Sequence, residues 1–433
     1  TQRRVNGRDL WSTRAIVNWE PSDRFRANVI WQHFEEDDDR SRTGKQLCTR
    51  DDGPAVIAGV AVPEEYRGRL SQGCSASSLY TDEAFGTPNA RGFAYIVAGH
   101  TVVTMGYDPD TFDLTYGIID ADPFAGVVQS RNLREISTSF DPVFRAKNDV
   151  VQFNMDFDIS DSVKFVSQTA YARDRYFSSQ DFNRYVSNPI FNDTNGLIGY
   201  DFSSPFNQFY GTPDGVFTDP QLGASRGILA LDINRSRNHQ WTQEFRLQSE
   251  FDGPLNFNVG ANYLNFKTQD DYFVFNNVFS FLAYNLQRPN IEDYYGGVCP
   301  EGDDLVDCVY IDPNPLSSLN EKGHNYFLSR NIAKTESWSV FGELYWNATD
   351  NVKVTLGARL TRDRKTFTPV PSQLLLGGGF EYGSSGGYVN SGYPADLDFV
   401  QRWTKPTGRF IVDWTPDLSF SDKTLVYASF SRG

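Results

Sequence analysis

Short segments of this chain alternate strictly between apolar and polar side chains, and this pattern constrains the fold more than any other feature. In segment 151–159, Val151, Phe153, Met155, Phe157 and Ile159 fall on one side, and amides or acids stand between them. Successive side chains of a β-strand point to opposite faces, so each segment predicts a strand with one apolar and one polar face.

The alternating segments come in pairs that are joined by short turns. Asp, Asn, Gly, Pro and Ser are concentrated at the turns near 20–23, 160–162, 251–254, 348–351 and 415–422. These residue types supply the backbone angles that a reversal requires. The sequence therefore predicts five hairpins, or about ten strands.

The connections between hairpins are long and fall at about 36–148, 178–239, 268–334 and 365–404. Short turns at one end of a sheet and long loops at the other are typical of transmembrane β-barrels. Trp19, Trp31, Trp346 and Trp414 stand near strand ends, as rings at a membrane interface do. We expect an all-β, antiparallel up-and-down transmembrane β-barrel with long extracellular loops. Its apolar face would meet lipid, and its polar face, with Asn154 and Lys353, would line a lumen.

Composition narrows the alternatives. The formal charge of −15 argues against a nucleic-acid binder, which needs a basic face. No segment reaches the roughly 18 apolar residues of a membrane-spanning helix. Aromatic residues make up 15% of the chain, which fits a barrel with aromatic girdles or a carbohydrate-binding β protein. A secreted sandwich or jelly roll remains the alternative fold, although its loops are usually shorter.

Four strand motifs resemble those of TonB-dependent outer-membrane receptors. Gly357–Lys365 (GARLTRDRK) resembles their GxRxTxDxK strand, and Thr242–Ser249 (TQEFRLQS) resembles their TQExRLxS strand. Leu425–Gly433 (LVYASFSRG) resembles the vYaSyxxGfk strand, and Phe341–Glu343 (FGE) resembles a motif upstream of the first. The motifs occur in family order, each beside a short turn, and the resemblance spans about residues 9–433.

The resemblance implies a 22-stranded barrel that is filled by an N-terminal plug. Such receptors sit in the outer membrane of Gram-negative bacteria, contact its lipid and import scarce large solutes, typically ferric siderophores, haem, cobalamin or glycans. Energy comes from the TonB complex, which pulls on the plug. We expect residues 1–433 to be one partial barrel domain, because we find no plug or TonB box in it, and both ends read as cuts within a longer protein.

No catalytic constellation emerges, so we expect no enzyme activity, no cofactor and no metal site. The four histidines (His33, His100, His239 and His324) lack metal-ligand spacing, and His33 reads as an interface residue. The acidic run Glu35–Asp39 could bind calcium, but a solvated strand end is the favoured interpretation.

The candidate site residues lie in the long connections. Cys48, Cys74, Cys299 and Cys308 form two sequence-local pairs, and loop-closure entropy favours Cys48–Cys74 and Cys299–Cys308 disulfides. The second pair is flanked by Tyr294, Tyr295 and Tyr310, which are substrate-binding candidates that the stapled loop would present to a ligand. Other aromatic residues cluster after one strand, and they are candidates for stacking on a ligand or for packing between loops: Tyr272, Phe273, Phe275, Phe279, Phe281 and Tyr284.

Active nutrient uptake is therefore the leading function. A passive porin and a secreted glycan-binding protein are the alternatives. Connections 36–148 and 268–334 carry −12 of the net −15 charge, and an acidic mouth would favour neutral or cationic solutes.

Overall fold

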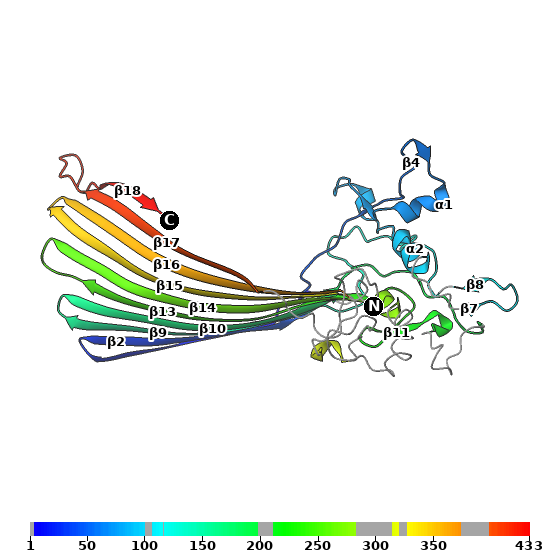
Figure 1. The fold of residues 1–433 in the computed structure, drawn as a ribbon, viewed down its shortest axis with the longest axis horizontal. Coiled ribbons are helices and arrows are strands. Elements are labelled where there is room, and N and C mark those ends of the chain that lie inside the picture. The colour runs from blue at the N-terminus through cyan, green and yellow to red at the C-terminus, as the bar shows by residue number, and fades with distance from the viewer. Residues whose placement is uncertain are drawn as a thin grey trace.

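One ten-stranded antiparallel sheet dominates the structure, a computed structural model that describes residues 4–99, 106–115, 117–197, 211–282, 314–319, 327–373 and 398–433 (Figure 1). Neighbours in the sheet are neighbours in the chain, so its topology is up-and-down. The prediction of an all-β antiparallel fold with about ten strands is confirmed. The strands are β1 (Leu10–Ser22), β2 (Phe25–Asp38), β9 (Val143–Ser160), β10 (Val163–Asp181), β13 (Ala230–Ser249), β14 (Leu255–Asn276), β15 (Phe327–Thr349), β16 (Val352–Gln373), β17 (Phe399–Trp414) and β18 (Val426–Arg432).

All five short turns lie on one rim of the sheet, at the left in Figure 1. They connect β1 to β2, β9 to β10, β13 to β14, β15 to β16 and β17 to β18. The described parts of the first three long connections lie at the opposite end. The predicted separation of short turns from long loops is therefore confirmed.

The strands run further toward the long loops than the alternation of apolar residues indicated. β13 begins at Ala230 and β14 ends at Asn276, although the connections were expected to cover 178–239 and 268–334. The backbone ladder continues through polar pairs such as Arg237–Gln269 and Asp271–Arg330. Backbone pairing does not depend on apolar side chains, so the apolar pattern ends before the strand does.

The first long connection, 39–142, forms several small elements. They are β3 (Thr49–Arg50), β4 (Val56–Ile57), β5 (Val60–Ala61), α1 (Glu64–Arg67), η1 (Gly68–Leu70), β6 (Cys74–Ser75), η2 (Asp82–Ala84), α2 (Arg91–Gly99), β7 (Gly106–Tyr107) and β8 (Leu114–Thr115). The second contains η3 (Pro213–Gly215), β11 (Phe217–Asp219) and β12 (Gly223–Ser225), and the third contains η4 (Leu316–Ser318). Among the described residues, no helix has the length and apolar character to cross a membrane.

Two hydrophobic clusters hold the long loops to the sheet. The loop cluster joins residues of three connections, among them Ile118, Phe191, Phe217 and Phe281. The sheet cluster joins Ile233, Phe273, Phe275 and Leu328 of the strands to residues of the connections, namely Leu222 and Leu319. The long-loop end therefore has buried cores of its own.

Candidate functional site

The strand register divides the sheet into an apolar face and a polar face. Phe153 faces Val29 on one neighbouring strand and Thr169 on the other, and Leu356 lies between Leu344 and Phe410. Large apolar side chains of this face are exposed on every strand of the sheet. An exposed apolar surface of this extent is a contact surface for lipid or protein rather than for water.

Aromatic rings border the apolar face on both sides. Trp19, Trp346 and Trp414 lie toward the short turns, and Trp31, Trp241 and Trp338 lie toward the long loops. All six are exposed. His33 packs against Trp31 and Trp11, with ring centroids 6.0 and 4.7 Å away, and its Nδ1 is 2.6 Å from Asp149 Oδ1. His33 is thus a packed residue of this aromatic border.

The opposite face is polar and internally hydrogen-bonded. Asn154 and Asp156 pair with Asn28 and Arg26, away from the apolar residues, as predicted. Asn154 donates to Asn28 Oδ1 at 2.8 Å, and Arg26 lies 3.0 Å from Asp158. Such a face suits a water-filled lumen.

A cluster of charge lies on the polar face at β15–β17. Arg409 is 2.5 Å from Glu343, and the Tyr345 hydroxyl donates to the same carboxylate at 2.6 Å. The Arg359 guanidinium lies 5.6 Å from the centre of the Phe341 ring. A shallow hollow beside them is lined by Phe341, Glu343, Gly357, Arg359, Thr407, Arg409 and Ser431. Paired charges and an aromatic ring offer polar and stacking contacts to a ligand on this part of the polar face.

The first long connection returns onto the upper part of the polar face. Arg42 Nη2 lies 2.8 Å from Asp232 Oδ2, and the Asp232 side chain is only 4% exposed. The Tyr272 hydroxyl donates to the same oxygen at 3.0 Å. Gln180 Oε1 accepts from the Ser41 hydroxyl and from the Arg42 backbone N–H at 2.9 and 3.0 Å. Residues 41–43 are therefore fixed over the polar face.

The predicted ligand-binding aromatic residues have different surroundings from those expected. Tyr272, Phe273 and Phe275 belong to β14 and not to a loop. Phe273 and Phe275 are fully buried, with stacked rings 6.0 Å apart, so they have no free face for a ligand. Phe281 is buried in the loop cluster, and Phe279 packs against this cluster. Phe273, Phe275 and Phe281 thus pack against neighbouring residues, as in the alternative interpretation, because β14 extends beneath the loops. Tyr284, Tyr294, Tyr295 and Tyr310 lie outside the described residues.

The Cys48–Cys74 disulfide is present, with a Cα–Cα distance of 5.4 Å, and it joins the start of the first connection to β6. Cys299 and Cys308 lie outside the described residues, and their pairing stays a prediction.

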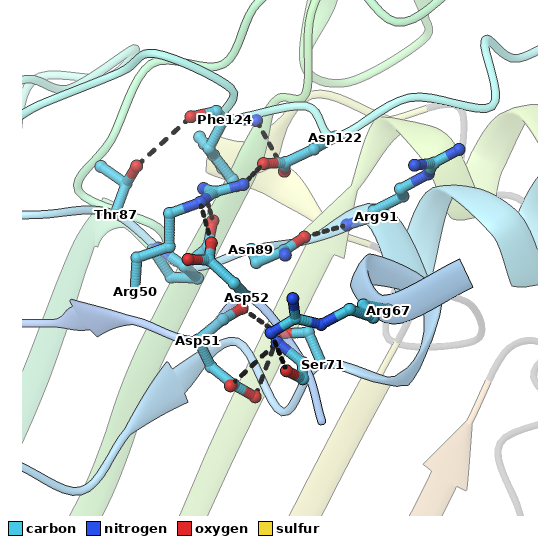
Figure 2. A network of polar contacts seen from close by, with 12 residues as sticks. Arg50, Asp51, Asp52, Arg67, Ser71, Thr87, Asn89, Arg91, Asp122 and Phe124 are labelled. Atoms are coloured by element: carbon cyan, nitrogen blue, oxygen red, sulfur yellow. Dashed lines mark hydrogen bonds and ion pairs between the residues drawn. The ribbon is translucent and has the colours of Figure 1, made fainter. Parts of the chain in front are cut away.

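Around the disulfide, a polar network fixes the loop backbone (Figure 2). Arg50 forms a salt bridge with Asp122 and donates to the Pro88 carbonyl at 3.2 Å. The Asp51 carboxylate accepts from the backbone N–H groups of Gln72 and Gly53, and these bonds lower its pKa. Gly53 has φ = +85°, and a Cβ there would lie 2.0 Å from the Arg67 carbonyl oxygen, so only glycine fits. The polar groups of this network bind one another, so the network stabilises the fold of the loop.

The acidic run Glu35–Asp39 is largely occupied by basic partners. Glu36 lies 2.8 Å from Arg8 and 3.1 Å from Arg40, and Asp37 lies 3.1 Å from Arg145. Within the described ranges, no group of acids, histidines or cysteines has the arrangement of a metal site.

Solved structures of uptake receptors align with nearly all of this chain. No protein-family model and no curated protein matches the sequence. The ferric yersiniabactin uptake receptor of Yersinia pestis aligns with 98% of the chain at 10% identity and a TM-score of 0.44. The siderophore receptor PiuA of Acinetobacter baumannii aligns with 98% at 13% identity and a TM-score of 0.42. The closed form of the Escherichia coli ferric-catecholate import receptor aligns with 98% at 10% identity and a TM-score of 0.45.

The chain covers 37%, 42% and 43% of these three structures, which is less than half of each. In its strand motifs this chain resembles the TonB-dependent outer-membrane receptors, and the three solved structures named above are receptors for uptake or import.

Proposed function

We propose that this chain forms part of the barrel wall and the outer loops of a TonB-dependent receptor in the outer membrane of a Gram-negative bacterium. The receptor would actively import a scarce large nutrient: siderophore-bound iron, haem, cobalamin or a glycan. One observation carries the proposal. A sheet with an apolar band between two aromatic borders has all its short turns on one rim and folded long loops on the other. This arrangement is typical of an outer-membrane barrel.

The two faces support different parts of the proposed function. The apolar face, with Val151, Phe153 and Leu356, would contact lipid. The polar face would line the solute path, and residues 41–43 are held over it through Asp232 and Gln180. Loops anchored in this way would narrow the path, which fits a selective receptor better than an open pore. Coupling to the TonB complex would act through a plug inside the barrel.

The test is solute uptake by the full-length receptor in cells. Radiolabelled ferric siderophores, haem, cobalamin and maltodextrins are offered to cells with and without functional TonB. We expect saturable uptake of one of these solutes that disappears in the strain without TonB.

Reconstitution separates this proposal from a porin. The purified full-length protein is placed in liposomes, and swelling in small sugars is measured. An active receptor leaves the liposomes closed to sugars. Rapid swelling together with TonB-independent uptake would contradict active transport and identify the passive porin.

A further inference from the structure

A row of cations follows the apolar face immediately beyond its aromatic border on the long-loop side. On this face of β10, Arg173 and Arg175 follow Tyr171, and on β13, Arg237 and His239 precede Trp241. Basic residues continue at the same level of the sheet through β17. We call this row the basic belt. It comprises Arg173, Arg175, Arg237, Lys267, Lys334, Arg362, Arg364 and Arg402. This concentration of positive charge stands on a protein whose formal charge is −15.

Like charges of the belt lie directly opposite one another on neighbouring strands. The opposed pairs are Arg175–Arg237, Lys267–Lys334 and Arg364–Arg402. Like charges in opposed positions destabilise a sheet. Three such pairs concentrate positive charge on one face of the sheet, and the carboxylates of the strands neutralise only part of it.

The carboxylates on the same face neutralise only part of the positive charge of the belt. Glu336 of β15 lies 2.8 Å from Lys334 and 3.8 Å from Arg364. For Arg173, Arg175, Arg237 and Lys267, no carboxylate of the described residues lies within salt-bridge distance, and all four side chains are exposed. In the register, His239 pairs with Arg173 and Lys267, and Arg175 pairs with Lys147 as well as with Arg237. The acid opposite Arg173 on β9 is Asp149, which is bound to His33 at 2.6 Å.

The belt is bounded on both sides. Below it lie the exposed rings of Trp241 and Trp338 and then the apolar band. Above it, the buried Asp271 carboxylate binds Arg235 at 2.9 Å and Arg330 at 2.7 Å, beside the loop-covered sheet cluster. Arg235 and Arg330 are thus neutralised at the level where the loops begin, whereas the belt beneath them is open.

A shallow hollow of about 440 Å³ marks one end of the belt. It is lined by two aromatic rings, one carboxylate and three guanidinium groups: Tyr263, Trp338, Glu336, Arg362, Arg364 and Arg402. Guanidinium groups bind phosphate oxygens in a bidentate manner, and the neighbouring rings give an apolar floor.

We propose that the basic belt binds the phosphate groups of an anionic membrane lipid whose acyl chains lie on the apolar band. The continuity of the two surfaces selects this occupant. A molecule that contacts both surfaces must be amphiphilic, with its negative charge at the headgroup. An acidic protein partner would complement the belt but would leave the apolar band uncovered. Charge complementarity supplies attraction and relieves the three opposed like-charge pairs. The proposal requires the sheet to span a membrane, but it does not depend on which solute the receptor transports.

The test measures the thermal midpoint Tm of the full-length receptor in detergent, with phosphatidic acid, phosphatidylcholine or inorganic phosphate added. The belt variant Arg237→Gln/Lys267→Gln removes one partner from each of two like-charge pairs. The control Lys164→Gln/Arg246→Gln removes two charges from β10 and β13 on the polar face, where they lie near Asp158 and Glu244.

We expect phosphatidic acid to raise the Tm of the unmodified receptor more than phosphatidylcholine does, and inorganic phosphate to leave it unchanged. The belt variant should lose at least half of this rise, whereas the control keeps it. Without lipid, the belt variant should have a higher Tm than the control. The belt variant loses repulsion between like charges, whereas the control loses attraction between opposite charges. Equal effects of the two lipids, the same rise with inorganic phosphate, or a full rise in the belt variant would each overturn the proposal. The comparison of lipids uses the unmodified receptor and stands even where a variant does not fold.

Discussion

The short-turn rim and the long-loop end of the same sheet hold their residues in place by different means. At the rim, four of the five hairpins close within a few residues, the β17–β18 connection at 415–425 is longer, and alternation alone assigns side chains to faces. At the other end, residues far apart in sequence meet, as Arg42 and Asp232 do, and two buried clusters and a disulfide fix the loops. A membrane can support the first region from outside, whereas the second must supply its own core.

The disulfide sharpens this comparison most strongly. Cys48→Ser with Cys74→Ser opens a loop with a sequence separation of 26 residues. In the chain-entropy model, a loop of this length loses about 3.5 kcal/mol of stability. We expect faster proteolysis and faster hydrogen exchange within residues 48–74, with unchanged exchange in β9–β17. Equal loss of protection in those strands would contradict the independence of the two regions.

A charge on the apolar face tests the membrane-supported region. Leu356 is 48% exposed on that face, and Leu356→Arg should cost roughly 2–4 kcal/mol at the middle of a bilayer. Thr361→Arg is the control, because Thr361 lies on the polar face of the same strand opposite Ser339. The measurement is the fraction of folded receptor in isolated membranes. Equal losses for the two variants would contradict the assignment of faces.

The anchor of the first loop tests the long-loop end. Arg42→Ala leaves the buried Asp232 carboxylate without its cation, although Tyr272 still donates to it. We expect a loss of about 2 kcal/mol, because an incompletely satisfied buried charge remains. Hydrogen exchange should rise at residues 39–47 and stay constant at the short turns. The matched variant Arg131→Ala, whose salt bridge with Asp82 is exposed, should have little effect. An equally large effect of Arg131→Ala would contradict the role of burial.

A glycine within the sheet tests packing on the polar face. A Cβ at Gly260 would lie 2.5 Å from both the Phe341 ring and the Phe245 carbonyl oxygen. Gly260→Ala should therefore destabilise the sheet by about 1–3 kcal/mol. Phe341→Ala in the same chain should recover only part of this loss, since the backbone contact remains. Urea unfolding of the reconstituted receptor measures both, and full recovery would place the whole cost on the ring.

Acid should loosen the first loop by a smaller amount. Backbone N–H groups of Gln72 and Gly53 lower the pKa of Asp51, so its charged form is favoured in the folded loop. A lowered pKa adds stability above the ordinary value of 3.8, and this stability is lost as pH falls through the lower folded pKa. Hydrogen exchange at residues 51–73 should therefore rise below about pH 4, and Asp51→Asn should remove this dependence. An unchanged pH response in Asp51→Asn would assign it to another group.

The sequence by itself determined the sheet. The period of two along Val151–Ile159 and Val352–Leu360 assigns each side chain to a face, and Asp, Asn, Gly and Pro set the turns, because both signals are local. The same locality made Cys48–Cys74 predictable, since nearby cysteines close the smaller loop.

Only the tertiary structure decided what happens where the loops meet the strands. Phe273 and Phe275 are candidates for ligand stacking in sequence, yet loop residues such as Leu222 and Leu319 cover them. Arg42 meets Asp232, and Arg175 faces Arg237, across separations that carry no sequence period. These contacts depend on the stagger between strands and on how long connections fold back. Neither is encoded in alternation, because alternation gives the face of a side chain and not its neighbour.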